Sequence, residues 1–354
     1  MNSTPRRPTA ATFIVRWLSL LSLLISPLMV TAAVAPASLT IYAVRIANVT
    51  DHAFTVSWLT SGPAAGQMHY GTTPALGGSR NDDAGAGPYT HHVTLSGLIP
   101  ATTYYFDVIA DGQVENNAGA HYQVTLPPTG GIPPEADYFW GYVFQADGIT
   151  PAAGAIVYVM LEDGDGAGSP GSSAPLSALA DAAGVWYVNL AWARTADYST
   201  FFAYTASGGD LVDVQAQAGP DGSAAVTVDL GDSYVSGGVR TPLAIVLPPR
   251  LGAVRQGNAV VLTWQHSAQF TTYEVWRHTV PYFSPDDPSA SLIASGMPPA
   301  PDCTLDDGTI TCTDPSTVGN AGTNYFYLVR GIKEAGAAVD LNRVGEFDFN
   351  IEPG

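Results

Sequence analysis

Short runs in which hydrophobic and polar residues alternate dominate the chain beyond its N-terminal segment. Such runs lie at 54–60 (FTVSWLT), 91–98 (HHVTLSGL), 103–110 (TYYFDVIA) and 121–126 (HYQVTL), between segments rich in Gly, Pro and Asp. A period of two is typical of a strand with one buried face, and no later segment shows a sustained helical period. Strands at this density without intervening helices predict sandwiches or barrels. We therefore predict an all-β protein.

Two parts of the chain repeat one pattern. A hydrophobic strand ends in Trp58 near the start of one part and in Trp264 near the start of the other, and a Thr-x-Tyr-x-x-x-Val pattern follows, beginning at Thr102 and Thr323. We predict that each tryptophan fills the core between two sheets; an exposed ligand platform is the alternative. The tyrosine of each pattern is predicted to bond back to the preceding loop, as in a tyrosine corner.

These repeats resemble fibronectin type III modules, over residues 38–127 and 250–350. The first, with HYGTTPALGG and THHVTLSGLIPATTYYFDV, is similar to the fibronectin-like module that precedes the catalytic domain of purple acid phosphatases. That resemblance implies an accessory module. The catalytic half is not matched, because LGDSYVSGG at 230–238 is one residue short of the family's Gly-Asp-x-x-Tyr element and no Gly-Asn-His or Gly-His-x-His follows.

The segment 138–248 has a different sequence pattern. It contains WGYVFQADGITPAAGAIVYVMLED and ALADAAGVWYVNLA, which resemble the carboxypeptidase regulatory-like, transthyretin-like sandwich family. That resemblance implies a rigid spacer or stabilising appendage. The whole chain is thus predicted to form three tandem immunoglobulin-like or transthyretin-like β-sandwiches, and it resembles multi-module bacterial surface proteins.

The linker 128–137 before this segment is rich in Pro and Gly. Together with Leu126 and Pro127 it spells LPPTG, the form of a sortase signal. A working signal lies near the C-terminus and is followed by an apolar span and a basic tail, which this position lacks. Proline fixes φ and stiffens a linker, so we interpret the motif as a spacer.

The N-terminal segment predicts export. Arg6, Arg7 and Arg16 precede the apolar run WLSLLSLLISPLMV, and small residues follow it. This order is that of a secretory signal peptide, for which we predict residues 1–33; an uncleaved signal anchor is the alternative. The expected location is secreted, extracellular or at the cell surface, with no membrane span after signal removal.

Charge limits the partners. Lys+Arg total 13 against 31 Asp+Glu, a net charge of −18, and Lys333 is the only lysine. Phosphate binding needs clustered basic residues, so we expect no nucleic-acid partner. An extracellular protein or polysaccharide remains a possible ligand. We expect no cofactor.

Cys303 and Cys312 lie in CTLDDGTITC, where DDGT is a hairpin-turn signal. Exported chains permit disulfides, so we predict that this pair bridges a short hairpin.

Catalytic and metal-binding patterns are sparse. The seven histidines include no His-x-x-x-His pair, and His91 and His92 should point to opposite faces of a strand. The loop EDGDGAGSPG begins like a calcium loop at Asp163 and Asp165, but the next ligand position is Ala167. We interpret it as a hairpin tip, with calcium as the alternative.

These observations predict a non-enzymatic extracellular or cell-surface protein that acts as an adhesion, binding or spacer module. Tyr282 and Phe283, in the insertion PYFSPDD, are the candidate glycan-binding residues. The alternatives are an accessory subunit that positions a secreted hydrolase and, further off, a metallophosphatase-like hydrolase whose metal motifs are absent.

Overall fold

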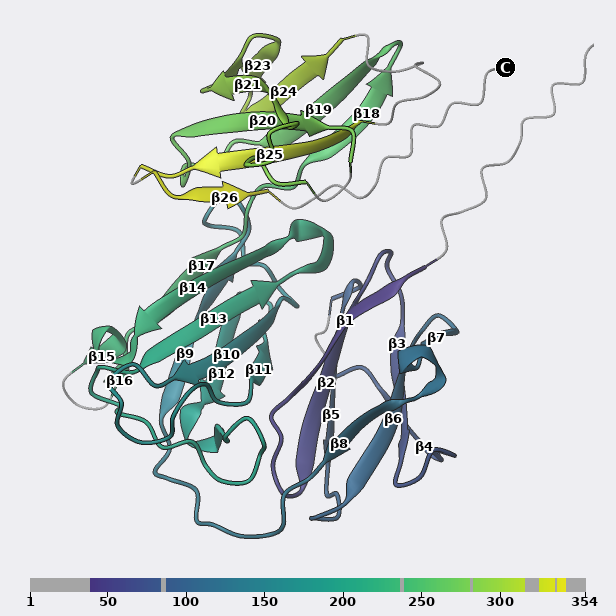
Figure 1. Cartoon of the computed structure of the whole chain (residues 1–354), viewed down its shortest axis with the longest axis vertical. Coiled ribbons are helices and arrows are strands. Elements are labelled where there is room, and N and C mark those ends of the chain that lie inside the picture. Colours follow the sequence, from purple (N-terminus) through teal and green to yellow (C-terminus); the bar gives the residue numbers. More distant parts are fainter. Residues whose placement is uncertain are drawn as a thin grey trace, which may run out of the picture. The chain divides into compact units, whose positions relative to one another are not determined.

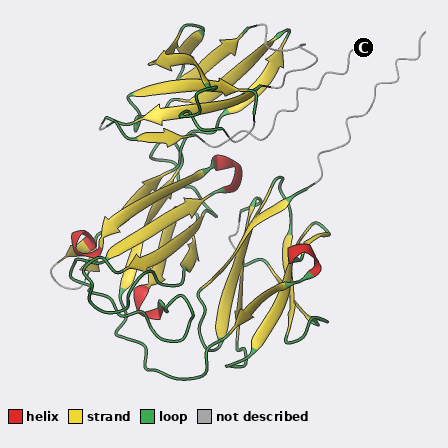
Figure 2. Cartoon of the chain, viewed as in Figure 1, coloured by secondary structure: helices red, strands yellow, loops and turns green. Residues whose placement is uncertain are grey.

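The computed structural model describes residues 39–83, 87–235, 239–280, 283–315, 325–334 and 336–341. The predicted signal peptide lies outside these residues. Figure 2 shows strands throughout the described part, where the helical elements are four 3-10 turns: η1 (Asn117–Gly119), η2 (Leu190–Trp192), η3 (Gly219–Asp221) and η4 (Leu230–Ser233). None of its helices is long and apolar enough to cross a membrane. The all-β prediction is confirmed.

The first sandwich consists of two antiparallel sheets (Figure 1). One has the strand order β1-β2-β5 (Ile41–Ala47, Ala53–Thr60, Thr90–Ser96). The other has the order β4-β3-β6-β7, and β8 also pairs with β6 (Gly78–Asn81, Gly66–Gly71, Thr103–Ala110, Gln113–Glu115, Tyr122–Thr125). Alternate residues of both sheets share one core.

Its core contains the residues that the repeat pattern singled out. Trp58 is fully buried and stacks on the ring of His91, with the centroids 5.1 Å apart. The hydroxyl of Tyr104 accepts a hydrogen bond from the backbone N–H of Ile99 (2.9 Å), which confirms a tyrosine corner. Leu126, the first residue of the LPPTG motif, is also buried in this core.

The second sandwich also has two sheets. The three-stranded sheet has the order β12-β9-β17 (Val185–Asn189, Tyr138–Phe144, Leu243–Val246), and β17 runs parallel to β9. The four-stranded sheet has the order β11-β10-β13-β14 (Leu176–Leu179, Ile156–Glu162, Leu211–Gln217, Ser223–Asp229). A small hairpin pairs β15 with β16 (Tyr234–Val235, Val239–Arg240). Trp186 is fully buried in the core between the two main sheets.

The third sandwich repeats the two-sheet plan. Its sheets have the orders β18-β19-β24-β23 (Gly252–Gln256, Ala259–Gln265, Thr309–Asp314, Cys303–Asp306) and β22-β21-β20-β25-β26 (Pro299–Ala300, Ser291–Gly296, Thr272–His278, Phe326–Ile332, Ala338–Asp340). Trp264 is 2% exposed, so the core interpretation of both repeat tryptophans is confirmed. Tyr325 lies under the guanidinium of Arg277 (4.6 Å), and the loop before it is outside the described residues; a second tyrosine corner stays a prediction.

Candidate functional site

A row of four aromatic side chains lies along the outer face of β9. The strand reads YFWGYVF, and its pleat sends alternate residues to opposite faces. Phe139 and Val143 are fully buried in the core of the second sandwich. The opposite set forms the row: Tyr138, Trp140, Tyr142 and Phe144. Since the row extends over six residue-to-residue steps of the strand, it is about 20 Å long.

The neighbouring strand adds a fifth ring. Tyr187 of β12 pairs directly with Trp140 across the sheet, and its ring lies 6.3 Å from that of Tyr138 in an edge-on arrangement. Tyr138 is 56% and Tyr187 65% exposed, whereas the other three rings are half-buried. We call the five residues the aromatic face. Contiguous exposed patches of large apolar side chains often mark binding surfaces.

Contacts between the rings hold the row in order. The centroids of Trp140 and Tyr142 are 5.8 Å apart and those of Tyr142 and Phe144 5.7 Å apart, the latter pair nearly parallel. On the other side of the strand, a Cβ at Gly141 would collide with the backbone carbonyl of Leu243. The glycine therefore allows β17 to pair closely beside the row.

The face is uncharged. The strands β9, β12 and β17 contain no Asp, Glu, Lys, Arg or His. Polar groups on it are the tyrosine hydroxyls and the side chain of Asn189, at the end of β12. Such a surface offers ring area and a few hydrogen-bonding groups, but no ion pairs.

A buried ion pair fixes the beginning of β9. Arg240 binds Asp137 through two hydrogen bonds of 2.7 Å each, and its side chain is only 1% exposed. The backbone carbonyl of Arg240 accepts a hydrogen bond from the indole N–H of Trp140 (3.0 Å). Tyr204 donates to Asp137 (2.9 Å); burial raises the pKa of this tyrosine, and the adjacent carboxylate raises it further. The pair thus links the core directly to the aromatic face.

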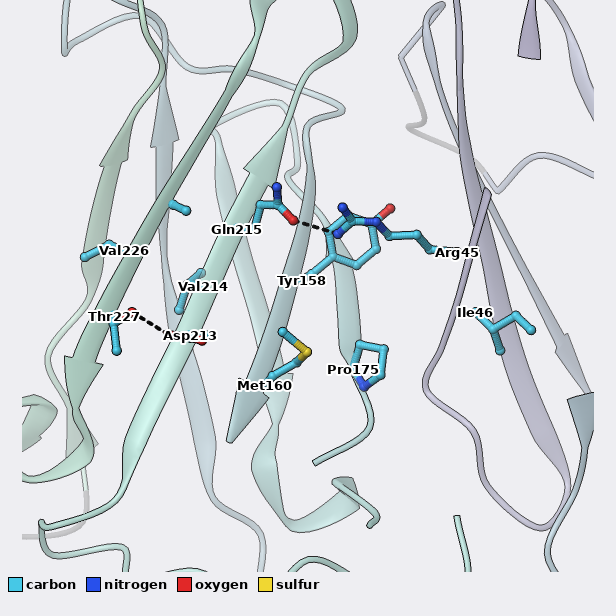
Figure 3. Close-up of a pocket in the computed structure, with 11 residues that line it drawn as sticks. Arg45, Ile46, Tyr158, Met160, Pro175, Asp213, Val214, Gln215, Val226 and Thr227 are labelled. Carbon is cyan, nitrogen blue, oxygen red and sulfur yellow. Dashed lines mark hydrogen bonds between the residues drawn. The ribbon is translucent and has the colours of Figure 1, made fainter. Parts of the chain in front are cut away.

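A groove of about 570 Å³ lies between the first two sandwiches (Figure 3). Its walls come from β1 of the first and from β10, β13 and β14 of the second. The Arg45 guanidinium lies 4.6 Å from the centre of the Tyr158 ring and donates to Gln215 (2.6 Å), the contact drawn in Figure 3. The cationic group is therefore occupied by contacts within the protein.

Polar side chains beside this groove join the two sandwiches. The hydroxyls of Ser57 and Tyr158 are 2.7 Å apart. The side-chain amide of Asn48 donates to the backbone carbonyl of Ser177 (2.9 Å) and accepts from the Ser177 backbone N–H (2.8 Å). Ser57 is fully buried and Tyr158 is 3% exposed, so this hydroxyl pair is shielded from water.

Asp83, His92 and Ser177 form a relay that resembles the acid–base–hydroxyl order of serine hydrolases. His92 lies between the two, with Nδ1 3.2 Å from Asp83 and Nε2 3.1 Å from the Ser177 hydroxyl. His92 is 6% and Ser177 7% exposed, and Asn48 also donates to the Ser177 hydroxyl. A nucleophile needs access to its substrate, which this interface denies; the relay is a structural contact.

His91 and His92 point to opposite faces of β5, as predicted. His91 faces the core, where it stacks on Trp58 and bonds to Asp82 (2.6 Å), while His92 faces the second sandwich. The two rings do not converge on one site.

The predicted glycan-binding pair finds no support at Phe283. This residue is 7% exposed and stacks on His278, with the ring centroids 5.2 Å apart. It fills a space under its own loop because an aromatic ring gains more from packing than from exposure. Tyr282 lies outside the described residues.

The predicted calcium candidates gain a third carboxylate. Oxygen atoms of Asp163, Asp165 and the buried Asp210 lie within 4.8 Å of one another. Each of the three also accepts backbone N–H bonds from surrounding loops, as from Gly166 to Asp163 and from Gly164 to Asp210. These carboxylates have the oxygen chemistry that calcium prefers, and calcium at this position stays a prediction.

The predicted disulfide is confirmed. Cys303 and Cys312 are bonded and pair directly across the β23–β24 hairpin. Asp306 and Thr309 are the last pair before the turn that DDGT predicts.

Sequence reasoning missed the aromatic face. The signal was present as aromatic residues at every second position of YFWGYVF, a strand whose two faces are both apolar. What the sequence did not show was that β17 pairs with β9 along the edge opposite β12. Strand β9 thereby becomes the central strand of a three-stranded sheet, on whose outer face Tyr138 and Tyr187 are exposed.

Comparisons with known proteins bear on the first sandwich. Residues 41–126 match the family model of the purple acid phosphatase N-terminal domain, which confirms the similarity predicted for this segment. No curated protein matches the chain.

Three solved structures are among those similar to the chain. Pectate lyase PelI from Erwinia chrysanthemi, in complex with tetragalacturonic acid, is 24% identical over 27% of this chain and 27% of that chain, with a TM-score of 0.20. The sensor domain of the anti-sigma factor RsgI4 from Pseudobacteroides cellulosolvens is 16% identical over 27% of this chain and 100% of that chain, with a TM-score of 0.18. The FN1–FN3 domains of chicken CNTN1 are 11% identical over 84% of this chain and 96% of that chain, with a TM-score of 0.20. The aligned part spans only 27% of the pectate lyase chain. At these TM-scores the likenesses carry no argument about function. The chain is thus similar, over its first sandwich, to the accessory N-terminal module of the purple acid phosphatases.

Proposed function

We propose that this chain is a non-enzymatic extracellular or cell-surface protein, an adhesion, binding or spacer module whose contact surface is the aromatic face. The observation that carries the proposal is the exposure of Tyr138 and Tyr187 on an uncharged sheet. Aromatic residues are enriched where proteins contact partners, because they bury a large area with few rotatable bonds.

Export is part of the proposal. It is supported by the residues 1–33, whose order is that of a signal peptide, and by the disulfide Cys303–Cys312, which is compatible with an oxidising compartment. The resemblance of 138–248 to carboxypeptidase regulatory-like domains belongs here too, because such domains serve as rigid supports.

The sandwich architecture supports a role in presenting a surface. The buried contacts of Asn48, Ser57 and Tyr158 connect the first two sandwiches. A strand on a packed sheet holds its side chains in place, so a partner loses little free energy in ordering them.

The test is binding of the purified chain to a panel of soluble polysaccharides and matrix proteins. We expect saturable binding to at least one of them, and its loss in the double variant Tyr138→Ala/Tyr187→Ala. Binding that is unchanged in this variant would show that the aromatic face is not the contact surface.

One alternative is favoured by a specific finding. The match of residues 41–126 to a module that accompanies phosphatase catalytic domains supports an accessory role beside a co-secreted hydrolase. Co-purification of a hydrolase with the chain from its own culture medium would favour that role. Iron or zinc bound in stoichiometric amount would instead revive the hydrolase alternative.

A further inference from the structure

We propose that the aromatic face binds an uncharged, extended polysaccharide that runs along β9; the inference rests on the proposed function and names the ligand class of the same surface. Its basis is the juxtaposition of the aromatic row on β9 with Tyr187 on β12.

The shape of the site favours a polymer chain. Sites for small molecules are concave and enclose most of the ligand, whereas this site is the open side of a sheet. The row from Tyr138 to Phe144 is about 20 Å long because each strand residue advances about 3.3 Å. A row of this length contacts several consecutive units of a chain.

The chemistry of the site favours sugar rings. An aromatic ring carries partial negative charge on its face, and the C–H groups on one side of a pyranose carry partial positive charge. The sugar hydroxyls need partners at the edge of the contact, and the exposed tyrosines Tyr138 and Tyr187 carry hydroxyls that can supply them. The amide oxygen of Asn189 already accepts the backbone N–H groups of Asp137 and Ala191.

Charge decides between classes of polysaccharide. The three strands of the sheet carry no charged residue, and the whole chain has a net charge of −18. A polyanion would meet repulsion without a basic residue to offset it, and a polycation would find no carboxylate on the face. An uncharged chain avoids both costs.

A protein partner is less suited to the same surface. Protein interfaces surround their apolar centre with a polar, often charged rim that fixes orientation. The aromatic face has tyrosine hydroxyls in that position, which match hydroxyl-rich ligands. Binding between two copies of the chain would instead appear as a dimer in light scattering.

The experiment is affinity gel electrophoresis of the full chain in gels that contain hydroxyethyl cellulose, konjac glucomannan or polygalacturonate. We expect retardation by at least one of the two neutral polymers and none by polygalacturonate. Tyr187→Ala and Tyr138→Ala should each weaken binding about tenfold, equivalent to about 1.4 kcal/mol. Tyr187→Phe keeps the ring and should retain most of the affinity.

The control is Tyr42→Ala, which removes an exposed tyrosine (42%) from β1 of the first sandwich. It should leave retardation unchanged. Circular dichroism melting of every variant checks that the sandwiches stay folded, which we expect because the replaced rings are exposed.

Three results would overturn the inference. One is stronger retardation by polygalacturonate than by both neutral polymers. Another is binding by the neutral polymers that Tyr138→Ala and Tyr187→Ala leave unchanged. The third is a dimer in light scattering that the same variants dissociate. If no polysaccharide binds while a matrix protein binds through the aromatic face, the ligand class is wrong and the proposed function stands. If nothing binds, the inference fails together with the adhesion and binding roles, and of the proposed function the spacer role alone is left.

Discussion

The buried pair of Asp137 and Arg240 should be the most sensitive electrostatic contact of the second sandwich. The perturbation is Asp137→Asn, which keeps the shape of the side chain but removes its charge. Arg240 would then lose the charge of this partner and keep its neutral ones, among them the carbonyl of Leu230 (3.0 Å) and the hydroxyl of Ser233 (2.8 Å). A guanidinium that is 1% exposed regains almost no hydration.

The expected magnitude follows from these contacts. Removing one partner of a buried pair costs about 3–5 kcal/mol. The Asp137 side chain is 20% exposed and the neutral acceptors remain, so the expected loss lies at or below the lower end of that range, at about 2–3 kcal/mol. Such a loss corresponds to an opening equilibrium that is about 30 to 150 times more favourable.

Amide hydrogen exchange read by mass spectrometry is the suitable assay, because peptides from β9 and β17 report the second sandwich separately from the others. Exchange of these peptides should accelerate by the same factor, while peptides from β2 and β25 should not change. Asp340→Asn is the matched control: it breaks the exposed pair of Arg330 and Asp340 (2.8 Å) and should cost less than about 1 kcal/mol.

A change in Asp137→Asn as small as that of the control would contradict the prediction. It would mean that water or backbone carbonyls satisfy the guanidinium of Arg240 without the carboxylate. The affinity of the aromatic face offers a second reading, since the indole of Trp140 bonds to the backbone carbonyl of Arg240. We expect Asp137→Asn to lower the affinity of the aromatic face for its ligand as well.

Three further predictions concern the first and third sandwiches. Tyr158→Phe should destabilise the contact with the first sandwich by about 1–3 kcal/mol, because it leaves the buried Ser57 hydroxyl without its partner. The double variant Ser57→Ala/Tyr158→Phe should recover most of this stability, measured as protection of β2 and β10 against hydrogen exchange, and no recovery would contradict the account. Burial raises the pKa of Asp83, but the hydrogen bond and charge of His92 outweigh this effect and hold the pKa of the folded state below 3.8, so the stability that Asp83 contributes is present above pH 3.8 and is lost as the pH falls through the lower folded-state pKa. The difference in unfolding free energy between Asp83→Asn and the parent chain should therefore shrink on acidification. A difference that stays constant with pH would contradict the pairing with His92. Reduction of Cys303–Cys312, or the variant Cys303→Ser/Cys312→Ser, should lower the unfolding free energy of the third sandwich by about 2–3 kcal/mol, because the bridge closes a short hairpin. Urea unfolding monitored by hydrogen exchange in β19 and β24 measures the change, and an unchanged urea midpoint would show that strand pairing alone holds the hairpin.

The local features of the fold could be predicted from the amino-acid sequence. The period of two along FTVSWLT and TYYFDVIA predicted strands because a pleated strand sends alternate residues to opposite faces. The repeat tryptophans Trp58 and Trp264 were predicted in the cores and lie there, and the turn DDGT placed Cys303 opposite Cys312. These features depend on neighbours close in sequence or on hydrophobicity alone.

Which surfaces stay exposed depends on long-range strand pairing and could not be predicted from the sequence. Phe283 is as hydrophobic as the exposed rings of β9, yet the loop that holds it packs on His278. The open side of β9 depends on the pairing of β9 with β17, a hundred residues away, and no local pattern reports such a pairing. In the same way Asp210 joins Asp163 and Asp165, and Ser177 meets His92, only through strand order. Exposure is a property of the whole arrangement of layers, so a sequence that encodes every strand still does not show which of its faces meets water.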